Sequence, residues 1–389
     1  MKRRLLLIFL VGSSSLLAGD VDLFGYFESQ IMGAQINEDF IQMQSNKLRL
    51  DLEHRINRIE FRANVNWITY HGKTEWFIPD FLPEPIADQI PAALRPCFVL
   101  PFEDTSVLDN AFARISFRRW DLTAGKQQIS LGTGYAWNPT DLFNNKDLFD
   151  PTYEQPGHAA IRADIPLASR INLTCLYGPE DIWKNSSKAI DLKIGLGRFD
   201  CSLTVIEKQW TLHDYTHLFL TGPIEISETR RMFGGSLSGE LLGLGVWTEG
   251  GFNAMENSDD FTEVIAGTDY TFDSGTYVMG EVYYNSGCPE KATDYSLTDW
   301  MRYFSAEQKS INRYQVYLLL QHPVSDQTQA GMSIVAAGDG SVVLLPTLTT
   351  TPYENLEVLA YLNLYIGEEL KAFNPNQGNG GILRARIYF

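Results

Sequence analysis

After its first 19 residues, the 389-residue chain lacks an apolar run long enough to cross a membrane as a helix, which takes about 20 residues. It also has few cysteines, four in all, and their spacing matches no zinc or redox motif. It contains no convincing Gly-x-Ser-x-Gly elbow and no phosphate-binding glycine loop. A helical membrane protein is therefore excluded, and none of these motifs points to an enzyme.

Charged residues make up only 20% of the chain, and acidic ones prevail, giving a net charge of −17. A nucleic-acid partner is not expected, because phosphate binding needs a basic surface. Aromatic residues are frequent at 12%, while the mean hydropathy is slightly negative at −0.16. This combination is typical of membrane barrels, whose apolar residues are diluted by alternation with polar ones.

The N-terminus predicts export. A basic cluster at positions 2–4 precedes an apolar run at 5–11, and small residues follow. This is the layout of a secretory signal peptide, here assigned to residues 1–19. No cysteine lies at the predicted cleavage site of the signal peptide, so a lipid anchor is not expected. The exported chain, residues 20–389, is expected to form one domain that is either soluble or crosses a membrane as a barrel.

The last ten residues alternate in character. One face of an extended strand would carry four apolar side chains, namely Leu383, Ala385, Ile387 and Phe389. The opposite face would carry Arg384, Arg386 and Tyr388. This stretch resembles the closing strand of bacterial outer-membrane β-barrels. The resemblance implies that Phe389 is an assembly signal recognised by the barrel-assembly machinery, and that outer-membrane lipid surrounds the protein.

The same alternation recurs along the exported chain. From Ile59 to Trp67 every second residue is apolar, and the residues between are polar or charged. Period two over this length predicts a strand rather than a helix. We count about eighteen such segments, and sixteen is tenable. A soluble β-sandwich or propeller would also alternate, but no repeat of propeller length is evident.

Connections between these segments alternate in length. Short turns are predicted near Asn57, Trp120, Ala168, Gly197, Leu242, Ser274, Ser325 and Tyr353. Longer polar connections are predicted at 71–107, 130–156, 210–228, 286–310 and 368–379. Short turns at one end and long loops at the other are the layout of outer-membrane barrels. The predicted fold is all-β: a transmembrane antiparallel up-and-down β-barrel of a Gram-negative outer membrane, with both termini periplasmic.

The polar faces of the predicted strands give candidate pore-lining residues. These are Lys47, Arg49, Glu60, Arg62, Arg114, Arg118, Arg162, Arg384 and Arg386. A wall of guanidinium groups would focus anions in a pore. The alternative is that interleaved acids, including Glu28, Asp51 and Glu53, pair with the arginines and brace the barrel.

A second candidate region begins at Gly125-Lys126-Gln127 and continues through Gly132-Thr133-Gly134. It resembles the Gly-Arg-Gln strand and Gly/aromatic loop of porin-like barrels, including alginate-export-type families, and implies fold more than substrate. The loop is predicted to constrict the pore mouth through Tyr135, Trp137, Asn138, Asp141, Phe143, Phe149 and Tyr153. The alternative is an ordinary extracellular loop.

The remaining candidates are weaker. His213 and His217 have the helical spacing of a metal pair, but no third ligand is evident, so no metal and no cofactor are expected. Cys97 and Cys288 fall in long connections and could form a disulfide. The predicted function is a non-enzymatic porin-like channel for passive or facilitated diffusion of small polar or anionic solutes. The alternative is a structural or adhesion barrel whose acidic loops meet partners or divalent cations. The solute and the oligomeric state are left open.

Overall fold

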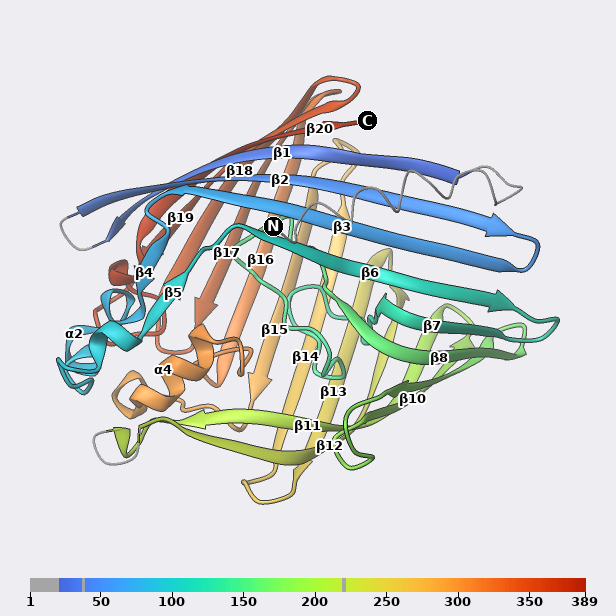
Figure 1. Cartoon of the computed structure of the whole chain (residues 1–389), viewed down its shortest axis with the longest axis horizontal. Helices are drawn as coiled ribbons and strands as arrows, with labels where there is room; N and C mark the ends of the chain where they lie inside the picture. The colour runs from blue at the N-terminus through green and yellow to red at the C-terminus, as the bar shows by residue number, and fades with distance from the viewer. Residues whose placement is uncertain (1–20, 37–38, 219–221) are drawn as a thin grey trace, which may run out of the picture.

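The computed structural model describes residues 21–389 apart from 37–38 and 219–221, so the predicted signal peptide at 1–19 lies outside the described residues. Eighteen antiparallel strands form one closed barrel, drawn from blue to red in Figure 1. Strand makes up 62% of the described residues. The predicted fold class and the count of eighteen strands are confirmed.

The first nine barrel strands are β1 (Val21–Ile36), β2 (Asp39–Ile56), β3 (Ile59–Gly72), β6 (Thr105–Ser116), β7 (Asp121–Gln128), β8 (Gly157–Ala168), β9 (Ile171–Gly178), β10 (Ser187–Leu196) and β11 (Phe199–Asp214). The others are β12 (Ile224–Leu241), β13 (Leu244–Met255), β14 (Phe261–Thr271), β15 (Tyr277–Asn285), β16 (Tyr314–Ser325), β17 (Thr328–Ala337), β18 (Val342–Tyr353), β19 (Leu356–Ile366) and β20 (Asn379–Tyr388). Each strand pairs with its sequence neighbours, and β3 pairs with β6 across an excursion of the chain.

The barrel closes where β20 pairs antiparallel with β1. Figure 1 shows the red strand β20 beside the blue strand β1. Phe389, just beyond β20, exchanges two backbone hydrogen bonds with Gly25, each 3.0 Å long. Closure of this kind leaves no strand edge, so the backbone polar groups of the wall are satisfied within the sheet.

Tight turns connect the strands at one end of the barrel. Asn57 has a φ of 55°, and Leu242 and Gly243 have φ values of 56° and 82°. Two successive residues with positive φ make the turn that suits the twist of paired strands. The turn positions predicted from the sequence agree with these within a residue or two.

The long connections gather at the other end. The predicted long connection 210–228 is wrong in its extent, because β11 continues to Asp214 and pairs there with Ile224 of β12. The other four predicted long connections are long in the structure, and three of them carry short helices. These helices and the accessory strands are β4 (Glu75–Phe77), η1 (Ile78–Phe81), α2 (Glu84–Ala87), η2 (Arg95–Cys97), β5 (Val99–Pro101), η3 (Ala292–Asp294), α4 (Leu297–Phe304) and η4 (Pro375–Gln377).

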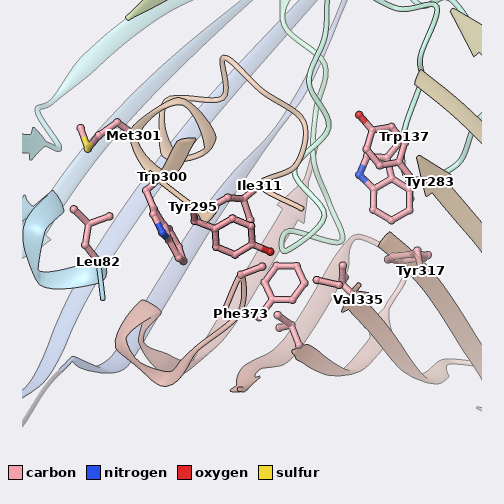
Figure 2. Close-up of a cluster of buried hydrophobic side chains, with 14 of the residues drawn as sticks. Leu82, Trp137, Tyr283, Tyr295, Trp300, Met301, Ile311, Tyr317, Val335 and Phe373 are labelled. Atoms are coloured by element: carbon pink, nitrogen blue, oxygen red, sulfur yellow. The ribbon is translucent and has the colours of Figure 1, made fainter. Parts of the chain in front are cut away.

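The long loops share one apolar core at their end of the barrel. Trp300 of α4 packs there with Leu82, Tyr295 and Phe373, which come from three different connections (Figure 2). Inward-facing residues of the wall, such as Val335 of β17, complete the cluster. Among the described residues, no helix is long and apolar enough to span a membrane.

Alternation places apolar side chains on the outside of the barrel. Leu203 of β11, Val282 of β15 and Leu318 of β16 are large apolar residues with 61%, 50% and 46% of their surface exposed. Their sequence neighbours point inward and include many polar groups. An outer apolar belt around a polar interior is what a barrel in lipid requires.

Deletion of Phe389 should lower the fraction of folded barrel, because two hydrogen bonds at the seam are lost together with an apolar residue of the outer belt. The heat-dependent shift in gel mobility of unboiled and boiled samples measures that fraction. Phe389→Tyr keeps the backbone and the ring, and it should fold as the parent does. An undiminished folded band after the deletion would remove Phe389 from the requirements for closure.

Candidate functional site

The connection between β7 and β8, residues 129–156, folds into the barrel and is called the crossing loop below. Ile129 and Phe143 at its first half pack on Ile206 and Met232, which point inward from β11 and β12. This apolar contact holds the start of the loop against one part of the wall. The rest of the loop is fixed by carboxylates.

Glu249 of β13 binds the backbone of the crossing loop. Its carboxylate accepts hydrogen bonds from the N–H groups of Thr133 (2.6 Å), Gly134 (3.2 Å) and Thr140 (2.6 Å). The hydroxyl of Thr140 donates a further bond of 2.8 Å. Glu249 is only 1% exposed. A buried carboxylate is tolerated because several donors replace the water that it has lost.

Glu281 of β15 repeats this arrangement two strands away. Its carboxylate accepts from the N–H groups of Tyr135 (2.8 Å), Ala136 (3.0 Å) and Trp137 (2.9 Å). The indole Nε1 of Trp247 donates a fourth bond of 2.6 Å. Two wall glutamates therefore satisfy six backbone N–H groups of a segment that forms no strand or helix.

Glycine makes this close approach possible. Gly132 has a φ of 82°, and a Cβ there would lie 2.5 Å from both carboxylate oxygens of Glu249. A Cβ on Gly134 would lie 1.8 Å from the carbonyl oxygen of Trp137. Any larger residue at either position would push the loop away from the wall.

The second half of the crossing loop reaches the opposite wall through Glu154. Its carboxylate lies 2.8 Å from Lys47 Nζ, 3.2 Å from Arg49 Nη1 and 3.6 Å from Arg386 Nη2. The hydroxyl of Tyr26 donates to it at 2.7 Å. The loop is thus tied to both sides of the lumen, by its backbone on one side and by side chains on the other.

Burial by itself would raise the pKa of Glu154, but hydrogen bonds and charge from Lys47, Tyr26 and Arg49 hold that pKa below its ordinary range. The folded value lies below the unfolded value of about 4.3. The contact therefore stabilises the folded chain fully above that value, and its effect is lost as the pH falls through the folded pKa.

Asp150 makes a second contact with the same wall. Arg384 Nη2 lies 3.2 Å from its carboxylate, and Arg384 Nε donates to Gln30 at 2.8 Å. Arg386 Nη2 is 2.6 Å from Glu28. Both arginines of the closing strand are therefore buried in ion pairs that join β20 to β1 and to the crossing loop.

The other arginines of the predicted basic wall are more open. Arg62 donates to Glu60 and lies 3.1 Å from Glu53, while Arg114 lies 3.8 Å from Glu60. The side chains of Arg62 and Arg114 are 47% and 40% exposed. Two guanidinium groups thus share Glu60 and still face open space.

Two further predicted residues, Arg162 and Arg118, differ in their positions. Arg162 of β8 pairs with Asp164 at 2.9 Å. The prediction that Arg118 lines the lumen is wrong, because β6 ends at Ser116 and Arg118 is exposed in the turn that follows. The turn begins earlier than the alternating pattern suggests, since Phe117 pairs with Trp120 across it.

Three cavities lie inside the barrel around the crossing loop. One of about 370 Å³ is lined by residues of β2, β3 and β6 to β8 and contains four arginines, Arg49, Arg62, Arg114 and Arg162. A second, of about 740 Å³, lies between the crossing loop and wall residues such as Asp269 and Tyr317. A third, of about 660 Å³, lies toward the long loops and includes Arg230 and Glu263. The interior is therefore divided by the loop but not filled.

Most of the aromatic and polar residues predicted for the constriction are buried in this arrangement. Trp137 stacks on Tyr283 of the wall with ring centres 5.0 Å apart (Figure 2). Asn138 donates to the carbonyl of Leu131, and Asp141 accepts from the N–H of Phe143 at 2.8 Å. These side chains stabilise the conformation of the crossing loop and do not face open space in the lumen.

Three other predicted residues differ in their surroundings. Tyr135 is 48% exposed and lines the 740 Å³ cavity. Tyr153 lines the same cavity. Phe149 packs against the apolar core of the long loops, with its ring 6.1 Å from that of Phe373. Tyr135 and Tyr153 are thus the aromatic residues of the predicted set that face open space here.

The sequence analysis missed Glu249 and Glu281. Each stands alone among small and apolar residues, in Thr248-Glu249-Gly250 and Gly280-Glu281-Val282. An isolated acid at an inward position of an otherwise apolar strand was the available signal, because a buried charge needs partners. Its partners lie more than a hundred residues away along the chain, and no local pattern names them.

The weaker candidates do not assemble into sites. All four cysteines are free, so the possible Cys97–Cys288 disulfide is absent; Cys97 is exposed, whereas Cys288 is buried and its thiol has a pKa raised to about 12 by burial. His213 lies in β11 and its Nδ1 is 2.7 Å from Glu307. Among the described residues, no group of three or more metal-binding side chains occurs.

Comparison with known proteins gives structural matches alone. No protein-family model and no curated protein sequence matches the chain. Solved structures of outer-membrane porins match the fold of the chain. OccK5 of Pseudomonas aeruginosa is 9% identical with a TM-score of 0.58, and the match covers 95% of this chain and 98% of that one. OccAB4 of Acinetobacter baumannii is 9% identical, with coverage of 95% and 97% and a TM-score of 0.56.

The chain has the fold of the outer-membrane porins. OccAB3 of Acinetobacter baumannii agrees with this, at 10% identity, coverage of 95% and 99%, and a TM-score of 0.55. Identities this low establish the architecture of a porin-type barrel and leave the solute to be argued from the residues of this lumen.

Replacing Glu249 and Glu281 together by Gln should release the first half of the crossing loop. Each lost acceptor leaves buried N–H groups without a partner, at a cost of about 1–3 kcal/mol per group. We expect faster protease cleavage within residues 133–146 of the folded barrel, measured by mass spectrometry of the fragments.

Asp269→Asn is the matched control for this variant. Asp269 also points into the lumen, but it accepts from the hydroxyl of Tyr277 and does not bind the crossing loop. Cleavage at the parent rate in the double variant would mean that the wall glutamates do not hold the loop.

Proposed function

We propose that the protein is a porin-like outer-membrane channel through which small polar or anionic solutes diffuse without chemical reaction or energy input. A closed barrel with an apolar outer belt suits lipid, and its polar, partly open interior suits solutes in water. The fold shared with outer-membrane porins supports this proposal.

The observation that carries the proposal is the composition of the 370 Å³ cavity. Its charged lining residues are four arginines and two acids, namely Arg49, Arg62, Arg114, Arg162, Asp51 and Glu53. A confined lining with more cations than anions concentrates anions and repels cations. An anionic or strongly polar solute is therefore the class that this part of the lumen favours.

The crossing loop would set the size limit. It is attached to β13 and β15 on one side and to β1, β2 and β20 on the other, so solutes must pass beside it. A loop held by buried charged groups keeps a fixed gap better than one held by apolar contact alone, because its hydrogen bonds are directional.

We assign the short-turn end of the barrel to the periplasm and the loops that carry helices to the cell exterior, which is the general arrangement of outer-membrane barrels. Both ends of the described chain, Val21 and Phe389, then lie on the periplasmic side. Transport is favoured over a structural or adhesion role, because adhesion would use the loop surface and gives no reason for an arginine-lined cavity inside.

Arg62→Ala combined with Arg114→Ala should lower anion preference. A guanidinium about 7 Å from a passing anion contributes on the order of 0.5 kcal/mol even at the dielectric constant of water, so losing two should reduce the anion-to-cation permeability ratio about threefold or more. The measurement is the reversal potential of single channels in planar bilayers across a salt gradient.

Arg118→Ala with Arg119→Ala is the control, since it also removes two arginines but from the exposed turn after β6. The control should keep the parent reversal potential. An equal shift in both variants would assign the effect to net charge rather than to the cavity. A correctly folded parent barrel that gives no conductance steps would contradict the channel itself.

A further inference from the structure

The cavity of about 740 Å³ between the crossing loop and the wall is rich in aromatic residues. Five of its 17 lining residues are aromatic, whereas aromatic residues make up 12% of the whole chain. Trp247 of β13, Tyr277 of β15 and Tyr317 of β16 line it from the wall. Tyr135 and Tyr153 line it from the crossing loop. Aromatic rings therefore border this cavity on both sides.

Trp247 presents one flat face of its ring to the lumen. It is paired across the sheet with Gly267 of β14, and a Cβ on Gly267 would lie 2.3 Å from two atoms of the indole. The indole can lie over the bare backbone there only because Gly267 has no side chain. The sheet covers one face of the ring, and the other face is left for the cavity that Trp247 lines.

A single carboxylate oxygen fixes this ring relative to the crossing loop. Oε2 of Glu281 accepts from the indole Nε1 of Trp247 at 2.6 Å and from the N–H of Tyr135 at 2.8 Å. The ring of Tyr135 is 48% exposed, and its centre lies 5.8 Å from that of Tyr317. The rings of the loop and the wall are thus held in place without any ligand.

Polar groups that the chain leaves unused lie beside these rings. In the part of the chain that the structure describes, the hydroxyls of Tyr135 and Tyr153 and the carboxamide of Gln155 make no hydrogen bond. Oδ2 of Asp269 accepts from the hydroxyl of Tyr277 at 2.9 Å, and its other carboxylate oxygen remains available. The lining therefore combines ring faces with both donors and acceptors.

The charges of this cavity do not favour a small ion. Its charged lining residues are Lys146, Asp147, Asp150, Glu154 and Asp269. Each of them already has an ion-pair or hydrogen-bond partner within the chain. Acids outnumber the lysine, so the lining attracts anions less than the arginine-lined cavity of 370 Å³ does.

We propose that this cavity binds a neutral sugar ring during its passage. A pyranose has flat C–H faces that pack on aromatic rings, and hydroxyl groups at its edge that donate and accept hydrogen bonds. The rings of Trp247 and Tyr135 contact the faces. The hydroxyl of Tyr153, the carboxamide of Gln155 and the available oxygen of Asp269 meet the edge. The inference rests on the proposed channel function and names a solute class for this part of the lumen.

A sugar explains both halves of the lining. Water would satisfy the hydroxyls and the carboxamide, but it would leave the exposed ring of Tyr135 in contact with water alone. A purely aromatic solute would cover that ring and leave the polar groups beside it without partners. The volume of about 740 Å³ also lies within the range of small-molecule sites, roughly 300–1,000 Å³.

The probe is maltose, added to single channels of the full barrel in planar bilayers at fixed salt. We expect current noise that saturates with maltose concentration. Tyr135→Ala keeps the N–H that Glu281 binds but removes the ring, so it should raise the half-saturating concentration about threefold or more. Tyr135→Phe keeps the ring and should stay closer to the parent. Tyr270→Ala removes a 41% exposed ring elsewhere on β14, outside the cavity lining, and should match the parent.

Conductance steps without saturable maltose noise would overturn the sugar site and leave the channel standing, whereas a folded barrel without steps would overturn both. Equal half-saturation in the parent and Tyr135→Ala would place the sugar elsewhere in the lumen. Tetramethylammonium or benzoate in place of maltose tests the other solute classes. Saturable noise from either ion that Tyr135→Ala weakens, with none from maltose, would assign the cavity to that ion and refute the proposal.

Discussion

Hydrogen bonding of the backbone in lipid is the constraint on which the rest of this structure depends. An unpaired N–H or C=O group in hydrocarbon costs several kcal/mol, so a sheet in a membrane has to close on itself. Here the closure is made by β1 and β20, and it extends to Phe389, which exchanges two bonds with Gly25. A closed sheet has no unpaired strand edge at which a ligand or another chain could bind. The features that distinguish this barrel must therefore lie inside it, on its loops, or on the outward side chains.

Inside the barrel, the same need for hydrogen bonds is met by side chains. The crossing loop has no strand partner, and Glu249 and Glu281 take that place for six of its N–H groups. At its far side the loop supplies the acids, Asp150 and Glu154, and the wall supplies the cations. The loop thus meets an acidic wall with backbone donors and a basic wall with carboxylates. A strongly acidic chain can in this way keep part of its lumen basic.

The sequence contains enough to predict the barrel, its strand count and its turns, because these depend on alternation and on local turn residues such as Asn57 and Gly197. The prediction from the sequence is wrong at residues 210–228, where β11 and β12 continue beyond the apolar belt. Pairing persists there, as between Asp214 and Ile224, but outward residues no longer need to be apolar, so the pattern that marks a strand disappears. The partners of the wall glutamates are likewise beyond local reasoning, because folding alone brings residue 133 beside residue 249.

The arginines of the predicted wall fall into two groups by burial, one that fits bracing and one that fits the proposed focusing of anions. Arg384 and Arg386 are 7% and 12% exposed and are held by Glu28 and the crossing loop, so they brace the seam. Arg62 and Arg114 are 47% and 40% exposed and share Glu60. Ion pairs this open to water are worth about 0–1 kcal/mol, so in the proposed channel a passing anion competes with Glu60 for these guanidiniums. Burial, more than the number of nearby acids, therefore decides which arginines remain available to a solute.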